Sequence, residues 1–227
     1  MRIQILGGGP GGLYAAILLK LREPSHDIHV IERNAPDDTF GWGVVFSDET
    51  LGNLEEADPV VYGRITESFA YWDSIDIHYR DACVRSGGHG FCGMSRKRLL
   101  QILQERARDL GVELTFRTEV EDLERLKAEA DLLICADGVN SKARALWADH
   151  FEPSVEPRKS PYIWFGSPAS FEAFTFSFRD NDHGIFQIHA YQFEAETSTV
   201  IVETDEETWK RAGLDTASTE ESIAYCE

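Results

Sequence analysis

Residues 1–34 read MRIQILGGGPGGLYAAILLKLREPSHDIHVIERN, and this stretch decides the fold. A short apolar segment leads directly into a run of glycines, and an Ala- and Leu-rich segment of helical character follows. A second apolar segment, Ile28–Ile31, ends at the carboxylate of Glu32. Strand, glycine turn, helix and strand in this order, closed by an acid, predict a Rossmann-like βαβ unit.

The glycine turn indicates what such a unit can bind. Gly7 allows a tight turn, Gly9 lets the backbone approach a pyrophosphate, and Gly12 lets the helix pack on the strand. The helix N-terminus then offers N–H groups and a positive dipole end to phosphates. Glu32 follows Gly12 by 20 residues, where a carboxylate can accept hydrogen bonds from ribose hydroxyls. The predicted binding residues of the turn are Gly7, Gly9, Pro10, Gly11 and Gly12. A glycine-rich turn that binds nothing is the alternative.

The composition limits the class of protein. The chain has 227 residues, 42% of them hydrophobic and 27% charged, as in globular proteins. Its 22 Lys and Arg against 40 Asp and Glu give a net charge of −18. Such a surface repels nucleic acid and anionic membranes, so we expect neither as a partner. No apolar run is long enough to span a membrane, and the first predicted strand leaves no room for a signal peptide. We therefore expect a cytoplasmic protein.

The four cysteines, Cys83, Cys92, Cys135 and Cys226, form no CxxC pair and show no zinc-type spacing to histidine. The sequence therefore predicts neither a metal site nor structural disulfides.

Two domains are expected. Residues 1–152 should form the dinucleotide-binding domain, with a small inserted strand region at about 60–94. Beyond residue 152 prolines separate alternating strands without long helices, so residues 153–227 should form part of a substrate domain built on an antiparallel β-sheet. Within the first domain we expect a loop at 35–46, helices at 48–57 and 96–110, and strands at 74–79, 90–94, 112–117 and 131–136.

One strand of the second domain has two unlike faces. Apolar side chains occupy every second position from Phe186 to Ala190. The positions between and after them carry Gln187, His189 and Tyr191, which must point the other way. We expect an apolar core face and a second face suited to the wall of a substrate pocket. A solvent-facing sheet surface is the alternative.

A second motif follows the apolar strand at 131–136. This strand delivers Asp137 and Gly138 to its C-terminal end, where open α/β sheets bind ligands. Together with the glycine turn, this pattern resembles the FAD-dependent aromatic hydroxylases of the p-hydroxybenzoate hydroxylase type. The segment Arg96–Leu99 is similar to the Arg-x-x-Leu segment of that family, whose Arg lies near the flavin.

The resemblance implies FAD as cofactor and assigns residues to it. Glu32 would contact the adenosine ribose, and Arg33 and Arg96 would neutralise phosphate charge. The other residues implied to bind the cofactor are Trp42 and Gly43, in a loop against the isoalloxazine, and Asp137 and Gly138, which would orient bound dinucleotide. Ordinary packing is the alternative for Trp42.

The runs GWGVVFSDETL, GMSRKRLLQIL and PYIWFGSPASF are similar to the branch of the family that acts on aromatic CoA thioesters, such as salicylyl-CoA and 2-aminobenzoyl-CoA. The branch implies NAD(P)H as a transient reductant, O₂ as co-substrate, and ring hydroxylation by a flavin C4a-hydroperoxide. His189 and Tyr191 are the candidate catalytic residues, because they could hydrogen-bond the substituent of the substrate ring. A related branch hydroxylates a tryptophan-derived substrate.

One departure from the family is clear. Its Gly-Asp motif, which contacts the flavin, does not occur in this sequence, and family members are longer. We therefore expect the N-terminal portion of a larger enzyme, whose C-terminal remainder would complete the site. Two other hypotheses stay open. One is a different FAD or NAD enzyme of the same two-domain class, although the Trp-x-Trp-x-Ile run of halogenases is absent. The other is a dinucleotide-binding module without catalysis.

Overall fold

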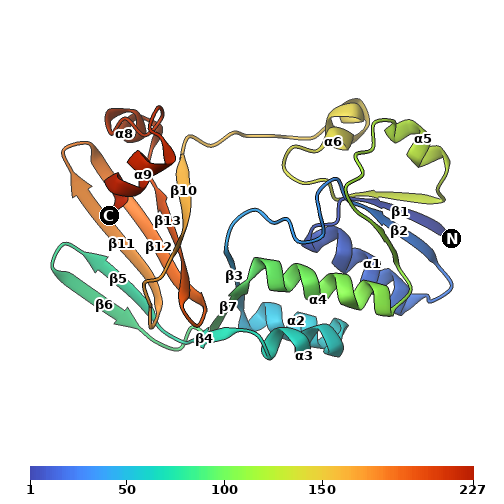
Figure 1. The fold of residues 1–227 in the computed structure, drawn as a ribbon, viewed down its shortest axis with the longest axis horizontal. Coiled ribbons are helices and arrows are strands. Elements are labelled where there is room, and N and C mark those ends of the chain that lie inside the picture. Colours follow the sequence, from blue (N-terminus) through green and yellow to red (C-terminus); the bar gives the residue numbers. More distant parts are fainter. The chain divides into compact units, whose positions relative to one another are not determined.

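The computed structural model describes all residues from Met1 to Glu227 and divides them into two compact units. The first unit comprises residues 1–40, 51–68 and 96–155. The second comprises residues 41–50, 69–95 and 156–227. The chain therefore passes repeatedly from one unit to the other (Figure 1).

These units differ from the expected domains in two segments. The division near residue 152 falls at Val155 in the structure, but residues 41–50 and 69–95 belong to the second unit. For residues 69–95 one reason is strand pairing: β5 (Ile75–Tyr79) lies beside β11 (Phe174–Asn181) in one sheet. The inserted strands at 60–94 were expected within the first domain, because no local pattern reveals a partner so distant in the sequence.

The first unit is built on a parallel sheet with the strand order β8-β2-β1-β9. Its strands are β1 (Arg2–Leu6), β2 (Asp27–Ile31), β8 (Glu113–Thr115) and β9 (Leu132–Cys135). The centre of the sheet is apolar, and Ile3 and Ile5 are almost fully buried. The predicted Rossmann-like βαβ unit is confirmed by β1, the helix α1 (Pro10–Arg22) and β2.

Helices enclose this sheet. Figure 1 shows α1 and α4 (Arg96–Asp109) side by side, and α1 packs against β1 and β2. A separate apolar cluster joins Ile31 of β2 to the short helices α5 (Leu123–Ala128) and α6 (Lys142–Leu146). The remaining helices of this part of the chain are α2 (Asp48–Ala57), α3 (Pro59–Thr66) and α7 (Ala148–Phe151).

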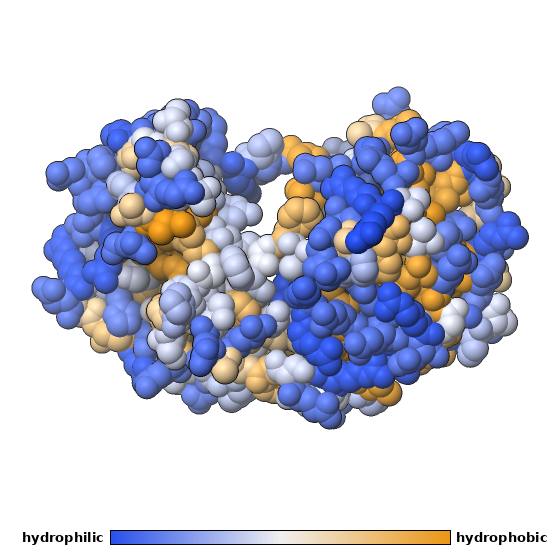
Figure 2. Space-filling model, viewed as in Figure 1, coloured by the Kyte–Doolittle hydropathy of each residue, from blue (hydrophilic) through white to orange (hydrophobic).

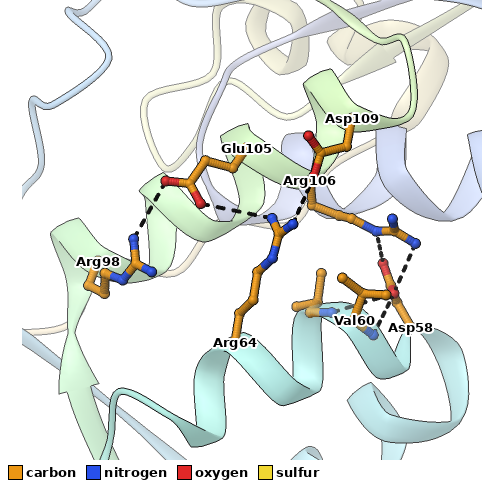
Figure 3. A network of polar contacts seen from close by, with 8 residues as sticks. Asp58, Val60, Arg64, Arg98, Glu105, Arg106 and Asp109 are labelled. Atoms are coloured by element: carbon orange, nitrogen blue, oxygen red, sulfur yellow. Dashed lines mark hydrogen bonds and ion pairs between the residues drawn. The ribbon is translucent and has the colours of Figure 1, made fainter.

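Helix α3 was not predicted, although the sequence contains its start signal. Asp58 caps the helix by accepting hydrogen bonds from the N–H groups of Val60 and Val61, and Pro59 occupies the first turn. The same carboxylate accepts hydrogen bonds from Arg106 of α4, at 2.9 Å from Nε and 3.2 Å from Nη2 (Figure 3). Asp58 is 1% exposed, so this ion pair lies in the interior between α3 and α4.

The second unit is built on a sheet with the order β10-β13-β12-β11-β5-β6. Its further strands are β10 (Tyr162–Ser167), β12 (Gly184–Glu194), β13 (Thr197–Glu203) and β6 (Ala82–Ser86). The predicted antiparallel sheet is confirmed for β10 to β13, and β5 joins it in parallel to β11. A Rossmann-like unit with a second, largely antiparallel unit is therefore the fold, as predicted.

One face of this sheet forms the core of the second unit. Phe186 and Val202 are buried there with Leu214, beneath α8 (Glu206–Arg211) and α9 (Thr219–Cys226). A smaller three-stranded sheet, β3 (Gly43–Ser47), β7 (Phe91–Ser95) and β4 (Ala70–Trp72), completes the unit. Strand β3 replaces the end of the loop that we expected at 35–46, because its apolar run pairs with β7.

The visible surface is mainly hydrophilic. In the view of Figure 2, hydrophilic residues cover most of the visible face, and apolar residues reach the surface in several places. None of the helices is both long enough and apolar enough to cross a membrane.

The buried ion pair yields a stability prediction. Asp58→Ala removes the cap of α3 and leaves the charge of Arg106 unpaired, so the free energy of unfolding should fall by about 3–5 kcal/mol. Urea denaturation followed by circular dichroism measures it. The matched control is Asp109→Asn, which breaks the exposed pair with Arg64 (Figure 3) and should cost about 1 kcal/mol or less. Equal losses in the two variants would contradict the prediction.

Candidate functional site

In the glycine turn, backbone segments pack so closely against one another that no side chain fits between them. A Cβ atom on Gly7 would lie 2.3 Å from the carbonyl oxygen of Ala136, just beyond β9, and the φ of Gly7 is +105°. A Cβ atom on Gly12 would lie 2.0 Å from the carbonyl oxygen of Gly7. Both distances are far below van der Waals contact, so only glycine fits at either position.

The other glycines of the turn are in open space. A Cβ atom on Gly9 or on Gly11 would meet nothing within 4 Å. Helix α1 begins at Pro10 without a side-chain cap and without an acid in its first turn. Its first N–H groups therefore lack intrahelical partners and keep their affinity for an anion.

Glu32, directly after β2, connects the turn to the next loop. Its Oε2 accepts a hydrogen bond from the N–H of Gly8 at 2.7 Å. Its Oε1 accepts two more from Asn34, one from the backbone N–H and one from the side-chain amide, both at 2.8 Å. A carboxylate offers about four acceptor positions, so Glu32 can still accept from a ligand.

A cavity of about 580 Å³ opens over this turn, entirely within the first unit. Its volume lies in the range of small-molecule sites. Eight predicted site residues line it, namely Gly7, Gly9, Pro10, Glu32, Arg33, Arg96, Asp137 and Gly138. Gly11 and Gly12 lie in the first turn of α1, which starts at the cavity.

Two polar atoms among the lining residues have no protein partner. The Nε of Arg96 and the Oγ1 of Thr39 are both buried and make no hydrogen bond. A buried donor without a partner costs free energy, and a cation without a partner costs more. Both residues line the cavity, so a small rotation of either side chain would present its polar atom to an anionic ligand with hydroxyl groups.

Asp137 accepts hydrogen bonds from residues at the start of α6. Its carboxylate accepts hydrogen bonds from the hydroxyl of Ser141 and the N–H of Lys142, each at 2.7 Å, and from the N–H of Ala143 at 3.3 Å. These bonds hold the start of α6 against the end of β9. Gly138, with φ of +86°, makes the turn that follows.

Thr39, Glu119 and Lys142 are among the lining residues that sequence reasoning missed. Lys142 pairs with Glu119, and its hydrogen bond and charge hold the pKa of the Glu119 carboxyl below its ordinary value. Lys142 lies within the motif that contains Asp137, so its position could have been noticed. Thr39 and Glu119 lie in loops without a recognisable pattern.

The remaining predicted residues lie in the second unit. Gly43 is held at both backbone groups, because its N–H donates to Thr199 Oγ1 at 3.0 Å and its carbonyl accepts from the Tyr191 hydroxyl at 2.9 Å. Trp42 lies over Gly166, where a Cβ would come within 2.8 Å of the indole, and its side chain is 48% exposed.

His189 and Tyr191 share the sheet face opposite the core, as predicted from their alternation in β12. Tyr191 is buried and its ring lies against those of Trp72 and Phe174. The Nε2 of His189 lies 2.6 Å from the amide nitrogen of Gln187. The structure thus gathers the predicted site residues in two groups, one in each unit.

Substitution of neighbouring glycines tests the close approach in the turn. Gly12→Ala should lower the free energy of unfolding by about 3 kcal/mol or more, because the new methyl group would overlap the carbonyl of Gly7. Gly11→Ala, in the same helical turn, has open space and should change it by about 1 kcal/mol or less. Urea denaturation compares the two. A Gly12→Ala variant as stable as Gly11→Ala would refute the geometry.

Two bacterial enzymes are similar in sequence to this chain. It is 46% identical over 215 residues to salicyloyl-CoA 5-hydroxylase of a Streptomyces species, covering 95% of this chain and 41% of that protein. It is 33% identical over 230 residues to protodeoxyviolaceinate monooxygenase of Chromobacterium violaceum, covering 99% of this chain and 61% of that protein. The chain therefore spans less than two thirds of the length of these relatives.

Solved structures share the fold. The tetrameric form of 2-methyl-3-hydroxypyridine-5-carboxylic acid oxygenase superposes with a TM-score of 0.77 at 19% identity, covering 99% of this chain and 64% of that one. The predicted resemblance to FAD-dependent hydroxylases is confirmed by these relatives. The profile of the FAD binding domain family matches residues 1–212, and the chain belongs to that family.

Proposed function

We propose that this chain binds FAD in the cavity of its first unit and serves the hydroxylation of an aromatic ring. The observation that carries the proposal is a cavity over an uncapped helix start, lined by Arg96, whose buried Nε has no hydrogen-bond partner. Bound FAD would take electrons from NAD(P)H and, with O₂, supply the hydroxylating chemistry. The residues of the chain would bind and orient the reactants and exclude water.

The pyrophosphate of FAD would lie over Gly9 and the first turn of α1. Gly9 presents no side chain, and the free N–H groups and dipole of α1 favour an anion there. Two positive charges would complete this site. Arg33 and Arg96 both line the cavity, and a local cation matters in a chain whose net charge is −18.

Glu32 would accept a hydrogen bond from a ribose hydroxyl of the adenosine at its remaining acceptor position. Its carboxylate is already oriented by Gly8 and Asn34, so little ordering is needed on binding. Asp137 and Gly138 would border the dinucleotide on the other side of the turn, with Asp137 held in place by its bonds to the start of α6.

In the second unit, the mixed face of the large sheet would contact the aromatic substrate. Phe176 packs edge-on against His189, so an aromatic surface lies directly beside a hydrogen-bonding group. We assign to His189 the hydrogen bond to the ring substituent. Tyr191 would act through the Trp42–Gly43 loop, because its hydroxyl holds the carbonyl of Gly43. That loop would border the isoalloxazine.

The proposed substrate class is an aromatic acyl-CoA thioester, such as salicylyl-CoA or 2-aminobenzoyl-CoA. Its support is the 46% identity to salicyloyl-CoA 5-hydroxylase, which extends across both units of this chain. The whole protein would hydroxylate the thioester, and this chain would supply the cavity for its cofactor.

FAD loading tests the cofactor site. The purified chain, mixed with FAD and freed of excess, should show flavin absorbance close to equimolar with protein. Gly9→Ala should leave stability unchanged but weaken FAD binding at least about tenfold, because the methyl group blocks the pyrophosphate. The control is Gly52→Ala in α2, which also has open space and lies outside the cavity. A colourless protein, or equal binding by Gly9→Ala, would refute the site.

Substrate stimulation tests the reaction. NADH or NADPH oxidation by the FAD-loaded whole protein should accelerate when salicylyl-CoA or 2-aminobenzoyl-CoA is added, and the free acids should have a weaker effect. The consumption of reduced nicotinamide, followed by its absorbance, measures the rate, and mass spectrometry identifies a hydroxylated thioester. Stimulation by the free acids alone would contradict the thioester class, and FAD binding without any stimulation would contradict the hydroxylase assignment.

A further inference from the structure

The hairpin of β5 and β6 brings three potential metal ligands together. His78 pairs directly with Cys83 across the hairpin, and Asp76 lies two residues before His78 on the same face. The ligand atoms of Asp76, His78 and Cys83 all lie within 4.8 Å of one another. None of these residues belongs to the cavity in the first unit.

We propose that Asp76, His78 and Cys83 bind a divalent transition-metal ion, with Zn²⁺ as the best match. Cys83 Sγ lies 3.6 Å from His78 Nε2. In a tetrahedral zinc site, bonds of about 2.3 Å to sulfur and about 2.0 Å to nitrogen place these two ligand atoms about 3.6 Å apart. The pair is therefore already spaced for zinc. A thiolate, an imidazole and a carboxylate are all ligands that zinc accepts.

Arg85 orients the carboxylate of Asp76 through two hydrogen bonds. The two guanidinium nitrogens donate to the two carboxylate oxygens at 2.6 Å each, and the Asp76 side chain is only 11% exposed. Each oxygen keeps a second lone pair for a metal ion. Hydrogen bonds of this kind orient ligands in metal sites, and Arg85 would play that role.

Ser177 offers a similar support for His78. It lies beside His78 in the register of β11 and β5, on the same face of the sheet. Its Oγ is buried and has no hydrogen-bond partner. A metal-bound histidine presents its other ring N–H to an acceptor, so Ser177 Oγ would accept from His78 Nδ1.

The site would be open on one side. Cys83 is exposed and His78 is half-buried, so an ion can enter and a water molecule can occupy the fourth position. With the thiolate, the carboxylate and the Arg85 guanidinium counted together, the zinc-bound site would carry one net positive charge, and the net charge of −18 on the chain favours the approach of cations.

Metal titration tests the proposal. The chain, treated with chelator and dialysed, should bind one Zn²⁺ in calorimetry, and Co²⁺ should produce a thiolate charge-transfer band in its absorbance spectrum. His78→Ala and Cys83→Ser should each weaken binding at least about tenfold. The matched control is Cys226→Ser, which changes a thiol in α9 of the same unit and should leave binding unchanged.

A second measurement uses the unaltered chain and so does not depend on the folding of any variant. Zn²⁺ should slow the alkylation of Cys83 by iodoacetamide, read by mass spectrometry, and leave the exposed Cys135 unprotected. Stoichiometric binding with selective protection of Cys83 would support the site. Absence of binding, equal binding by Cys83→Ser, or equal protection of both thiols would overturn it.

Discussion

The cavity of the first unit depends on one steric constraint, the contact of bare backbone at the glycine turn. Helix α1 can start where it does only because Gly12 lies against the carbonyl of Gly7, and Gly7 in turn lies against Ala136. Hydrogen bonds lock the same crossing, since Gly7 donates to Ile31 and Ala136 donates to Leu6. The ends of β1, β2 and β9 and the start of α1 thereby converge on one point, and the volume left above them is the site.

A comparable close contact organises the loop of the second unit, although aromatic rings replace backbone. Gly41, Gly43 and Gly166 each lie against a ring, of Trp164, Phe193 and Trp42 respectively. In each case a methyl group would overlap the ring, with separations of 2.4–2.8 Å. Glycine thus permits close packing in both units, once for a backbone crossing and once for large side chains.

Sequence patterns predicted most of the first unit because its signals are local. The glycine turn, the helix at 48–57 and the strand near 131–136 each follow from a short periodic run, and the structure confirms them. Eight predicted site residues meet in one cavity for the same reason, since parallel strands end at a common edge. The position of Asp137 at that edge could be predicted from the strand before it. Its hydrogen bonds to the start of α6 could not, because they depend on the conformation of the intervening turn.

Contacts between segments that are distant in the sequence could not be predicted. The pairing of β5 with β11 links residues about a hundred positions apart, and together with the contacts of β4 and β7 with β12 it places residues 69–95 in the second unit. The grouping of Asp76, His78 and Cys83 was also not predicted, although the three residues lie within one hairpin. The zinc motifs recognisable in a sequence have fixed spacings, whereas here the register between two neighbouring strands brings the ligand atoms together.

The hydrogen bonds of Glu32 have a thermodynamic consequence for any ligand of the cavity. Its two oxygens tie the glycine turn to the loop after β2 before a ligand arrives. The chain entropy of these two loops is therefore lost during folding and not during association. The ligand then binds to a site that is already ordered. The binding free energy therefore reflects the contacts with the ligand, with little entropy cost for ordering the two loops.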